Sequence, residues 1–377
     1  MAMSKPRVVM DSAIRVTPRL RALPIELVPL ASTDISSDAL VDAQALLTRT
    51  VTRVDGGLLE GSDIRFVGTA SAGSDHIDLN YLGAHGIHFS SAAGCNASAV
   101  GDYVLAAIAL CGKLEPILSG ADVGLVGYGN VGRSLAKRLA ALGARVHVYD
   151  PWVTQYDSHV QETDLQGVLS CDVVSLHAAL HDSQPFPSFG MIGVQEAKVI
   201  ERDTLFINAG RGGLLSEEAA SYLVERGVDL VLDTWPNEPR VSLELLMGVR
   251  YATPHIAGYS ETAKNNATDF LIPPLIETLE LEDHGAVPQS ETDRIVLPTG
   301  CADNSVLASL LSSVGRIEAD DAKFRAVWAR HQGPDTFERQ RREYTLRQQL
   351  EGLLVSGEAS SLRLNAWLEA LGVTLKH

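Results

Sequence analysis

The stretch DVGLVGYGNVGRSLAKRLAALG, residues 122–143, decides the fold. It begins with a short apolar run, continues into the glycine turn GYGNVG at 127–132, and ends in a segment with apolar residues at helical spacing. A strand that enters such a turn and leaves it as a helix is typical of dinucleotide-binding α/β domains. Gly127 permits the tight turn, Gly129 lets a pyrophosphate approach the backbone, and Gly132 allows the helix to pack closely on the strand.

An acidic residue follows at the position that selects the cofactor. Asp150 ends the next predicted strand, RVHVYD at 145–150. Its carboxylate can accept hydrogen bonds from both hydroxyls of an adenine ribose, and it would repel a 2′-phosphate. The sequence therefore predicts NAD rather than NADP as the cofactor. Tyr128, between the first two glycines, is interpreted as a tolerated turn side chain.

Further β-rich runs on both sides of this turn predict an α/β protein with two doubly wound parallel-sheet domains. Residues 99–259 are expected to form a Rossmann NAD-binding domain, with later strands in 171–177, 204–210 and 228–235. Residues 1–98 and 260–288 are expected to form a discontinuous, flavodoxin-like substrate-binding domain, with strands in 7–11, 45–51, 64–73 and 87–94. The charged, amphipathic residues 289–377 predict a small C-terminal α/β domain.

Composition limits the classes of partner. The chain has 377 residues and a net charge of −16, with a pI near 5.1. Such a surface repels nucleic acid and anionic lipid, so neither is expected as a partner. We expect no signal peptide and no apolar run of the roughly 18 residues that cross a bilayer. The scattered cysteines predict reduced thiols in a cytoplasmic protein without a metal site; they are Cys95, Cys111, Cys171 and Cys301.

Three polar motifs come at the ends of predicted strands, where doubly wound sheets bind their ligands. They are NAGRG at 208–212, DTWPNEP at 233–239 and PHIAGY at 254–259. Oxidation of a secondary alcohol by hydride transfer needs a base for the hydroxyl proton, and His255 suits this role. Glu238 can fix the tautomer of that histidine, and Arg211 can hold a substrate carboxylate with its planar fork.

With these motifs the sequence resembles the D-isomer-specific 2-hydroxyacid dehydrogenase family over nearly its whole length. The resemblance implies NAD as cofactor and Arg211, Glu238 and His255 as catalytic residues. It implies Thr50, Ser71 and Tyr259 as substrate-binding residues. The implied cofactor-binding residues are Gly127, Gly129, Asn130, Val131, Gly132, Asp150, Ala178, Ala209, Gly210, Asp233 and Gly258. Ala178 stands where members of the family usually have a threonine, so its contact would use the backbone.

A narrower resemblance rests on 47–54, 67–78, 89–100, 255–260 and the tail segments DDAKFR and FERQRREYTLRQQ. It implies a homodimer formed through a C-terminal dimerisation domain. It also implies 4-phospho-D-erythronate as the substrate, oxidised at C2 in a step of pyridoxal 5′-phosphate synthesis. Arg49 and Arg53 are candidates for binding the phosphate. Arg341 and Arg342 are candidates for side chains that reach the active site of the partner subunit.

Two alternatives remain at this point. The chain could oxidise another D-2-hydroxy acid, such as phosphoglycerate or glycerate, which a panel of phosphorylated and unphosphorylated acids would reveal. It could also be a non-catalytic protein that senses NAD(H) and engages a partner through its tail. Such a sensor would bind NAD tightly and oxidise none of these acids.

Overall fold

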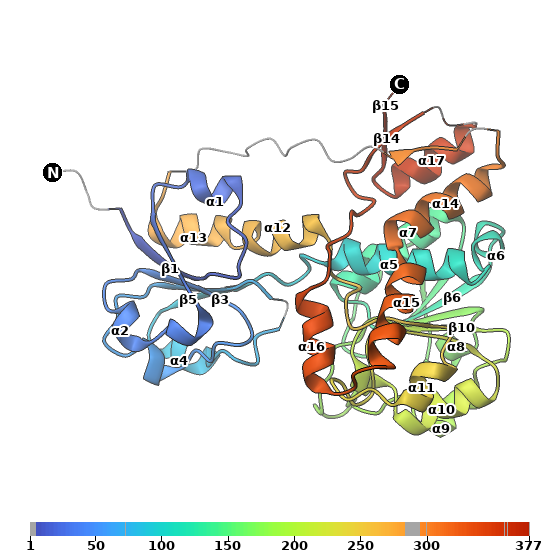
Figure 1. The fold of residues 1–377 in the computed structure, drawn as a ribbon, viewed down its shortest axis with the longest axis horizontal. Helices are drawn as coiled ribbons and strands as arrows, with labels where there is room; N and C mark the ends of the chain where they lie inside the picture. Colours follow the sequence, from blue (N-terminus) through green and yellow to red (C-terminus); the bar gives the residue numbers. More distant parts are fainter. Residues whose placement is uncertain are drawn as a thin grey trace. The chain divides into compact units, whose positions relative to one another are not determined.

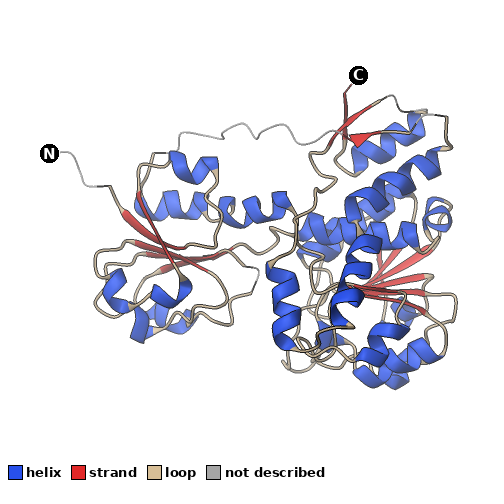
Figure 2. Cartoon of the chain, in the orientation of Figure 1, coloured by secondary structure: helices blue, strands red, loops and turns tan. Residues whose placement is uncertain are grey.

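The computed structural model describes residues 5–71, 73–282, 295–298, 300–357, 359 and 361–376. The chain divides into two compact units (Figure 1). The first consists of Met1–Asn96 and Thr262–Glu291, and the second of Ala97–Glu261 and Thr292–His377. In both units helices cover sheets of parallel strands (Figure 2). The predicted α/β class, with two main parallel sheets and a small C-terminal sheet, is confirmed.

The first unit is built on a five-stranded parallel sheet in the order β2-β1-β3-β4-β5, the strand order of flavodoxin-like folds. Its strands are β1 (Arg7–Asp11), β2 (Glu26–Leu30), β3 (Ala45–Thr48), β4 (Phe66–Thr69) and β5 (His88–Ser91). The four strands predicted here are confirmed, and β2 was missed. Pro29 lies within β2, and a proline is tolerated there because β2 is an edge strand.

Helices of the first unit come from two separate parts of the chain. The early ones are α1 (Pro18–Ala22), α2 (Ser37–Leu40), α3 (Gly56–Leu59) and α4 (Leu79–Ala84), with a 3₁₀ turn at Ser32–Asp34. The later ones are α12 (Glu261–Asp269) and α13 (Ile272–Leu279). Leu271 and Leu275 share a buried cluster with Leu47 and Phe66. This apolar contact explains why the chain returns to the first unit after residue 261.

The second unit contains a seven-stranded parallel sheet in the order β12-β11-β10-β9-β6-β7-β8. This is the Rossmann order with one extra strand, and its order reverses between β6 and β9. The strands are β6 (Asp122–Val126), β7 (Arg145–Tyr149), β8 (Val160–Glu162), β9 (Val173–Leu176), β10 (Leu205–Asn208), β11 (Asp229–Leu232) and β12 (Tyr251–Ala252). The short strands β8 and β12 were not predicted as strands.

The helices of this nucleotide-binding part include α5 (Ala97–Leu110), which is buried along most of its length. The others are α6 (Leu114–Leu118), α7 (Asn130–Leu142), α8 (Leu165–Leu169), α9 (Val194–Ala197), α10 (Glu217–Glu225) and α11 (Leu243–Gly248), with a 3₁₀ turn at Gly212–Leu214. Within the described part of the chain, no helix combines the length and the apolar character that a membrane crossing requires.

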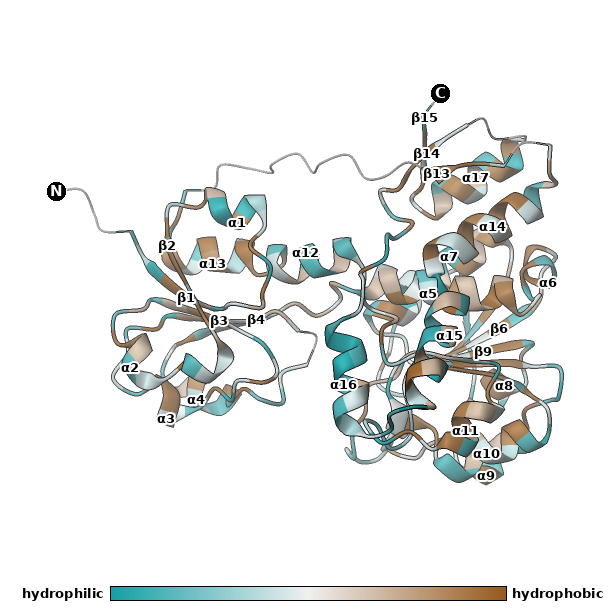
Figure 3. Cartoon of the chain, viewed as in Figure 1, coloured by the Kyte–Doolittle hydropathy of each residue, from teal (hydrophilic) through white to brown (hydrophobic). Residues whose placement is uncertain are grey.

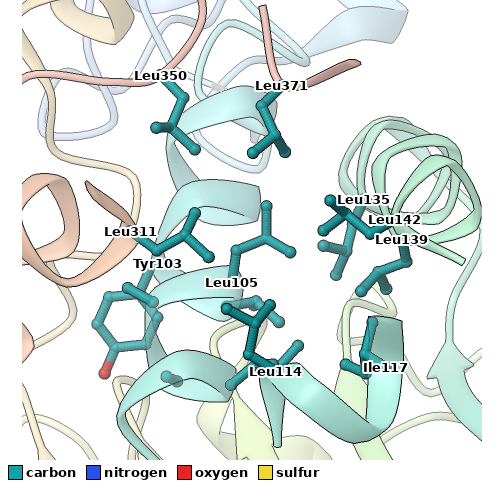
Figure 4. Packing of buried hydrophobic residues seen from close by; sticks show 14 of the residues in the cluster. Tyr103, Leu105, Leu114, Ile117, Leu135, Leu139, Leu142, Leu311, Leu350 and Leu371 are labelled. Carbon is teal, nitrogen blue, oxygen red and sulfur yellow. The ribbon is translucent and has the colours of Figure 1, made fainter. Parts of the chain in front are cut away.

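The tail packs into the core of the second unit. Leu311, Leu350 and Leu371 meet α5 and α7 in one buried cluster (Figure 4). The tail elements are β13 (Ile295–Val296), α14 (Asp303–Gly315), α15 (Ile317–Trp328), α16 (Pro334–Arg342), β14 (Leu354–Ser356), α17 (Leu362–Ala370) and β15 (Thr374–Lys376). The expected domain boundary at 288/289 lies outside the described residues, and the division into three domains stays a prediction.

Candidate active site

The glycine turn between β6 and α7 has the geometry that a pyrophosphate needs. Gly127 has a φ of +98°, and a Cβ there would lie 2.4 Å from the backbone nitrogen of Ala178. A Cβ on Gly132 would lie 2.2 Å from the carbonyl oxygen of Gly127, so the helix approaches the strand closely. A Cβ on Gly129 would meet nothing within 4 Å. The turn is therefore tight where the backbone packs and open at the N-terminus of α7, where an anion is stabilised.

Asp150 faces this turn from the end of β7. Its Oδ2 accepts a hydrogen bond from the Tyr128 backbone N–H at 2.7 Å, and its Oδ1 accepts one from Trp152 at 3.1 Å. These bonds orient the carboxylate, whose remaining lone pairs can accept from ribose hydroxyls. Asp150, the open turn at Gly129 and the Ala178 backbone together fit a bound dinucleotide.

The interpretation of Tyr128 as a mere turn side chain is wrong. Its side chain is fully buried, and its hydroxyl donates to Asp157 at 2.6 Å. Its ring lies 5.5 Å from the ring of Tyr156 and 4.3 Å from the guanidinium carbon of Arg133. Tyr128 therefore belongs to the packed support of the turn, a role that its position between two glycines did not indicate.

The three polar motifs meet because their strands are neighbours. β10 pairs with β11, and β11 pairs with β12, all in parallel, so their carboxyl ends lie at one edge of the sheet. The loop after β10 touches the loop after β11, since a Cβ on Gly212 would lie 1.7 Å from the carbonyl oxygen of Trp235. Arg211, next to Gly212, thus stands beside the segment that carries Glu238.

His255 and Glu238 form a hydrogen-bonded pair. The Nδ1 of His255 lies 2.7 Å from the Oε1 of Glu238, and the other carboxylate oxygen accepts the Trp235 backbone N–H at 3.2 Å. Burial raises the pKa of Glu238, but the hydrogen bond and charge of His255, with smaller contributions from Trp235 and Arg341, bring it below its usual value. An ionised carboxylate at Nδ1 leaves Nε2 as the ring nitrogen that can exchange a proton.

The backbone at His255 is unusual and is held in place. Its φ is +56°, a left-handed conformation that non-glycine residues rarely adopt. The fully buried Asp233 accepts hydrogen bonds from the backbone N–H groups of Ile256 and Ala257 and from the hydroxyl of Thr253, at 2.7, 2.9 and 2.7 Å. Asp233 therefore fixes the loop that presents His255. Its expected contact with NAD stays a prediction.

The other candidate residues lie at the same sheet edge or in the first unit. Arg211 is exposed, and its Nη1 donates to the Gly210 carbonyl at 2.9 Å. Asn130 and Val131 open α7, Ala209 and Gly210 follow β10, and Gly258 and Tyr259 follow His255. In the first unit Thr50 follows β3 and is exposed, and Ser71 follows β4 with its hydroxyl 2.7 Å from that of Thr69.

The two early arginines differ in their surroundings. Arg49 pairs with the buried Asp11 at 2.9 Å, whereas the side chain of Arg53 is 83% exposed and pairs with Asp55 at 3.0 Å. The ion pair of Arg49 therefore ties the start of its loop to the sheet of the first unit. Both remain candidates for binding an anion.

One supporting residue was missed by sequence reasoning. Arg347 is 1% exposed, and its guanidinium donates to the carbonyl oxygens of Ile256 at 2.9 Å, Tyr259 at 3.3 Å and Ala99 at 2.7 Å, and also to that of Ala257. The tail therefore stabilises the loop after His255 through hydrogen bonds to the backbone carbonyls of that loop. No motif marks Arg347, because it sits in a charged segment that has the composition of a solvated surface.

A partly buried histidine beside the glycine turn gives a pH-dependent stability. His177 follows β9, its Nε2 lies 2.9 Å from the hydroxyl of Ser175, and burial lowers its pKa from 6.5 to about 4. The unfolded chain thus takes up this proton near pH 6.5 and the folded chain only near pH 4. The contribution of His177 to the free energy of unfolding is therefore fully present above pH 6.5, and it is lost as the pH falls toward 4.

We expect His177→Gln to remove this component of the acid sensitivity. Between pH 7 and pH 4.5 the free energy of unfolding of the wild type should fall by about 1–3 kcal/mol more than that of the variant. Urea unfolding followed by circular dichroism at the two pH values measures both. Equal losses in the two proteins would contradict the burial of a neutral imidazole.

Comparisons with known proteins agree with this site. Residues 112–257 match the family described as D-isomer specific 2-hydroxyacid dehydrogenase, NAD binding domain. The erythronate-4-phosphate dehydrogenase of Marinomonas sp. (strain MWYL1) is 35% identical over 342 residues, which are 87% of this chain and 90% of the relative. That of Cellvibrio japonicus (strain Ueda107) is 36% identical over 363 residues, 92% of this chain and 94% of the relative.

Solved structures share the fold at lower identity. A glyoxylate reductase from Paecilomyes thermophila aligns with a TM-score of 0.59 and 21% identity, covering 74% of this chain and 96% of its own. The D-lactate dehydrogenase of Aquifex aeolicus, complexed with NAD and lactic acid, aligns with a TM-score of 0.54 and 20% identity. The alignment covers 72% of this chain and 95% of the lactate dehydrogenase chain. The predicted NAD-dependent oxidoreductase is confirmed. The chain belongs to the D-isomer specific 2-hydroxyacid dehydrogenase family, and within it to the group of the erythronate-4-phosphate dehydrogenases.

Proposed function

We propose that this chain oxidises 4-phospho-D-erythronate to (R)-3-hydroxy-2-oxo-4-phosphooxybutanoate with NAD, in the synthesis of pyridoxal 5′-phosphate. The observation that carries the proposal is the His255–Glu238 pair, 2.7 Å apart at the sheet edge that also carries the glycine turn. The name shared by relatives that are 35–36% identical over about nine-tenths of the chain supports the choice of substrate.

In this proposal the chain's own residues handle the proton and the substrate. A bound NAD would supply the acceptor for the hydride that leaves C2. His255 accepts the hydroxyl proton at Nε2, and Glu238 stabilises the resulting imidazolium through Nδ1. Arg211 holds the carboxylate beside the reacting carbon with its planar fork. The C2–H and O–H bonds break while the carbonyl forms, which balances the two-electron oxidation.

The remaining roles follow the chemistry of the residues. Thr50, Ser71 and Tyr259 are assigned to the substrate, whose hydroxyl and phosphate oxygens accept or donate hydrogen bonds. Asp150 is assigned to the adenine ribose, and its negative charge favours NAD over NADP. The backbone of the glycine turn, with Asn130 and Val131, is assigned to the pyrophosphate. Ala178, Ala209, Gly210, Asp233 and Gly258 are assigned to the rest of the cofactor.

We further propose that the chain acts as a homodimer in the cytoplasm, with the tail as the dimerisation element. A mass of 40.4 kDa is expected for one chain, so light scattering coupled to gel filtration separates monomer from dimer. A monomer at the concentrations used for activity assays would contradict the homodimer.

The test of the proposed reaction is the absorbance of NADH after the protein is mixed with NAD and single hydroxy acids. We expect 4-phospho-D-erythronate to have the highest kcat/KM in a panel with D-erythronate, 3-phospho-D-glycerate and D-glycerate. Faster oxidation of an unphosphorylated acid would contradict the phosphate specificity. Tight NAD binding without oxidation of any of these acids would contradict the assignment as an enzyme for them.

A further inference from the structure

The tail helix α16 is fixed against the segment that carries Glu238. Phe337 of α16 is buried, with its ring centroid 6.1 Å from that of Phe324, which lies 5.8 Å from Trp235. Trp235 in turn donates its backbone N–H to Glu238. These aromatic contacts determine where α16 stands relative to the His255–Glu238 pair.

Arg341 lies on the same face of α16 as Phe337. The two residues are four positions apart, which places them one above the other on a helix. The guanidinium carbon of Arg341 lies 5.9 Å from the Phe337 ring centroid, and its Nη2 lies 3.4 Å from the hydroxyl oxygen of Tyr259. Although α16 is hydrophilic over most of its length (Figure 3), the side chain of Arg341 is only 23% exposed. A partly buried cation therefore stands beside a residue assigned to the substrate.

The protein does not use all the donors of this guanidinium. Nη1 of Arg341 donates to Glu338 at 2.9 Å, but that carboxylate side chain is 54% exposed and well solvated. Among the described residues, the buried Nε has no hydrogen-bond partner. Nη2, the nitrogen beside Tyr259, makes a long contact of 3.4 Å with that hydroxyl, so this end of the guanidinium can donate to an oxyanion such as phosphate.

The chain that follows α16 is also joined to the loop after His255. Beyond the helix, Arg347 donates to the carbonyl of Tyr259, and Gln349 accepts the hydroxyl of Ser260 at 2.8 Å. Both contacts join the tail to the loop that follows His255. The position of Arg341 relative to Tyr259 is therefore set by packing on both sides.

The proposed substrate requires more positive charge than one arginine. It carries a carboxylate, assigned to Arg211, and a phosphate, which holds about two negative charges at neutral pH. The chain itself has a net charge of −16, so a local cation is needed. Solved relatives named for glyoxylate and lactate, acids without phosphate, cover only 72–74% of this chain although nearly all of their own. The match to the family's NAD-binding domain ends at residue 257, well before Arg341.

We propose that Arg341, together with the hydroxyl of Tyr259, binds the phosphate of the substrate and so creates the preference for a phosphorylated hydroxy acid. This inference rests on the proposed function and deepens it. The tail then contributes to specificity within its own chain.

The test compares Arg341→Met with the wild type on 4-phospho-D-erythronate and on D-erythronate. We expect KM for the phosphorylated acid to rise roughly 10- to 100-fold, the effect of losing charge-assisted hydrogen bonds. Kinetic constants for D-erythronate should change much less than KM for the phosphorylated acid, because Arg341 is the smallest of the influences on Glu238. Arg341→Lys should recover part of the lost affinity, because lysine keeps the charge without the fork. Inorganic phosphate, used as a competitive inhibitor, should lose affinity in parallel.

Arg339→Met is the matched control, since Arg339 is an exposed arginine of the same helix, two positions before Arg341. It should behave as the wild type, and thermal unfolding checks the fold of each variant. An equal loss on both acids would overturn the proposal and assign Arg341 to the electrostatics of Glu238. An unchanged KM in Arg341→Met, or a phosphate-specific loss only in Arg53→Met, would overturn it too. Failure of the wild type to oxidise 4-phospho-D-erythronate would instead refute the proposed function.

Discussion

Replacing His255 by alanine is expected to lower kcat about 100- to 10,000-fold, the range that a general base contributes. The physical reason is that Glu238 holds the imidazole of His255 at the proton-accepting position, with Nδ1 2.7 Å from Oε1. NAD affinity should remain unchanged, because the glycine turn and Asp150 lie on other strands. The rate of NADH formation and the binding of NAD, followed by titration calorimetry, measure the two effects separately.

The backbone at this position requires a second variant. His255 has a φ of +56°, and asparagine tolerates that left-handed conformation better than alanine does. His255→Asn therefore keeps the loop with little strain and still lacks a base near neutral pH. It should lose as much turnover as the alanine variant. If it retained most of the wild-type kcat, loop geometry rather than proton transfer would explain the alanine result.

Replacing Arg347 by methionine is expected to be the most destabilising of the substitutions considered. The side chain is 1% exposed, and its guanidinium donates to the carbonyls of Ile256, Ala257 and Tyr259, of which the Ile256 carbonyl also accepts from the Tyr259 backbone N–H. A hydrogen bond to a charged group contributes about 1.5–3 kcal/mol, so losing at least two of these buried bonds is expected to cost about 3–6 kcal/mol. Chemical unfolding of the wild type and the variant measures it.

The same substitution should impair catalysis in the molecules that remain folded. Arg347 supports the loop that begins at His255, and a displacement of about 1 Å at a catalytic group can cost about 100-fold in rate. We expect kcat, measured at low temperature on protein shown to bind NAD, to fall by about that factor. Arg347→Lys should recover part of both properties, since one ammonium reaches fewer carbonyls. A normal kcat in folded, NAD-binding Arg347→Met would limit Arg347 to a purely structural role.

The local sequence pattern was sufficient to predict an element or a site residue wherever the spacing of residues in a short segment restricts its structure. The segment 122–143 predicted β6, the turn and α7, because three glycines in that spacing leave few alternatives. Asp150, Glu238 and His255 could be identified because parallel strands end at one edge, so residues that follow successive strands converge there. The strand β2 could not be predicted from the sequence. Its proline argues against a strand unless the strand is known to lie at the edge of a sheet.

The sequence by itself determined the α/β class, the NAD-binding turn and the polar residues that follow β10, β11 and β12, since these depend on spacing within a few dozen residues. Only the tertiary structure decided that Tyr128 is buried, that Asp233 holds the loop after His255, and that Arg341 and Arg347 of the tail stand beside that loop. Their contacts join residues far apart in the chain, and the partners are backbone groups or packed rings that no local pattern encodes.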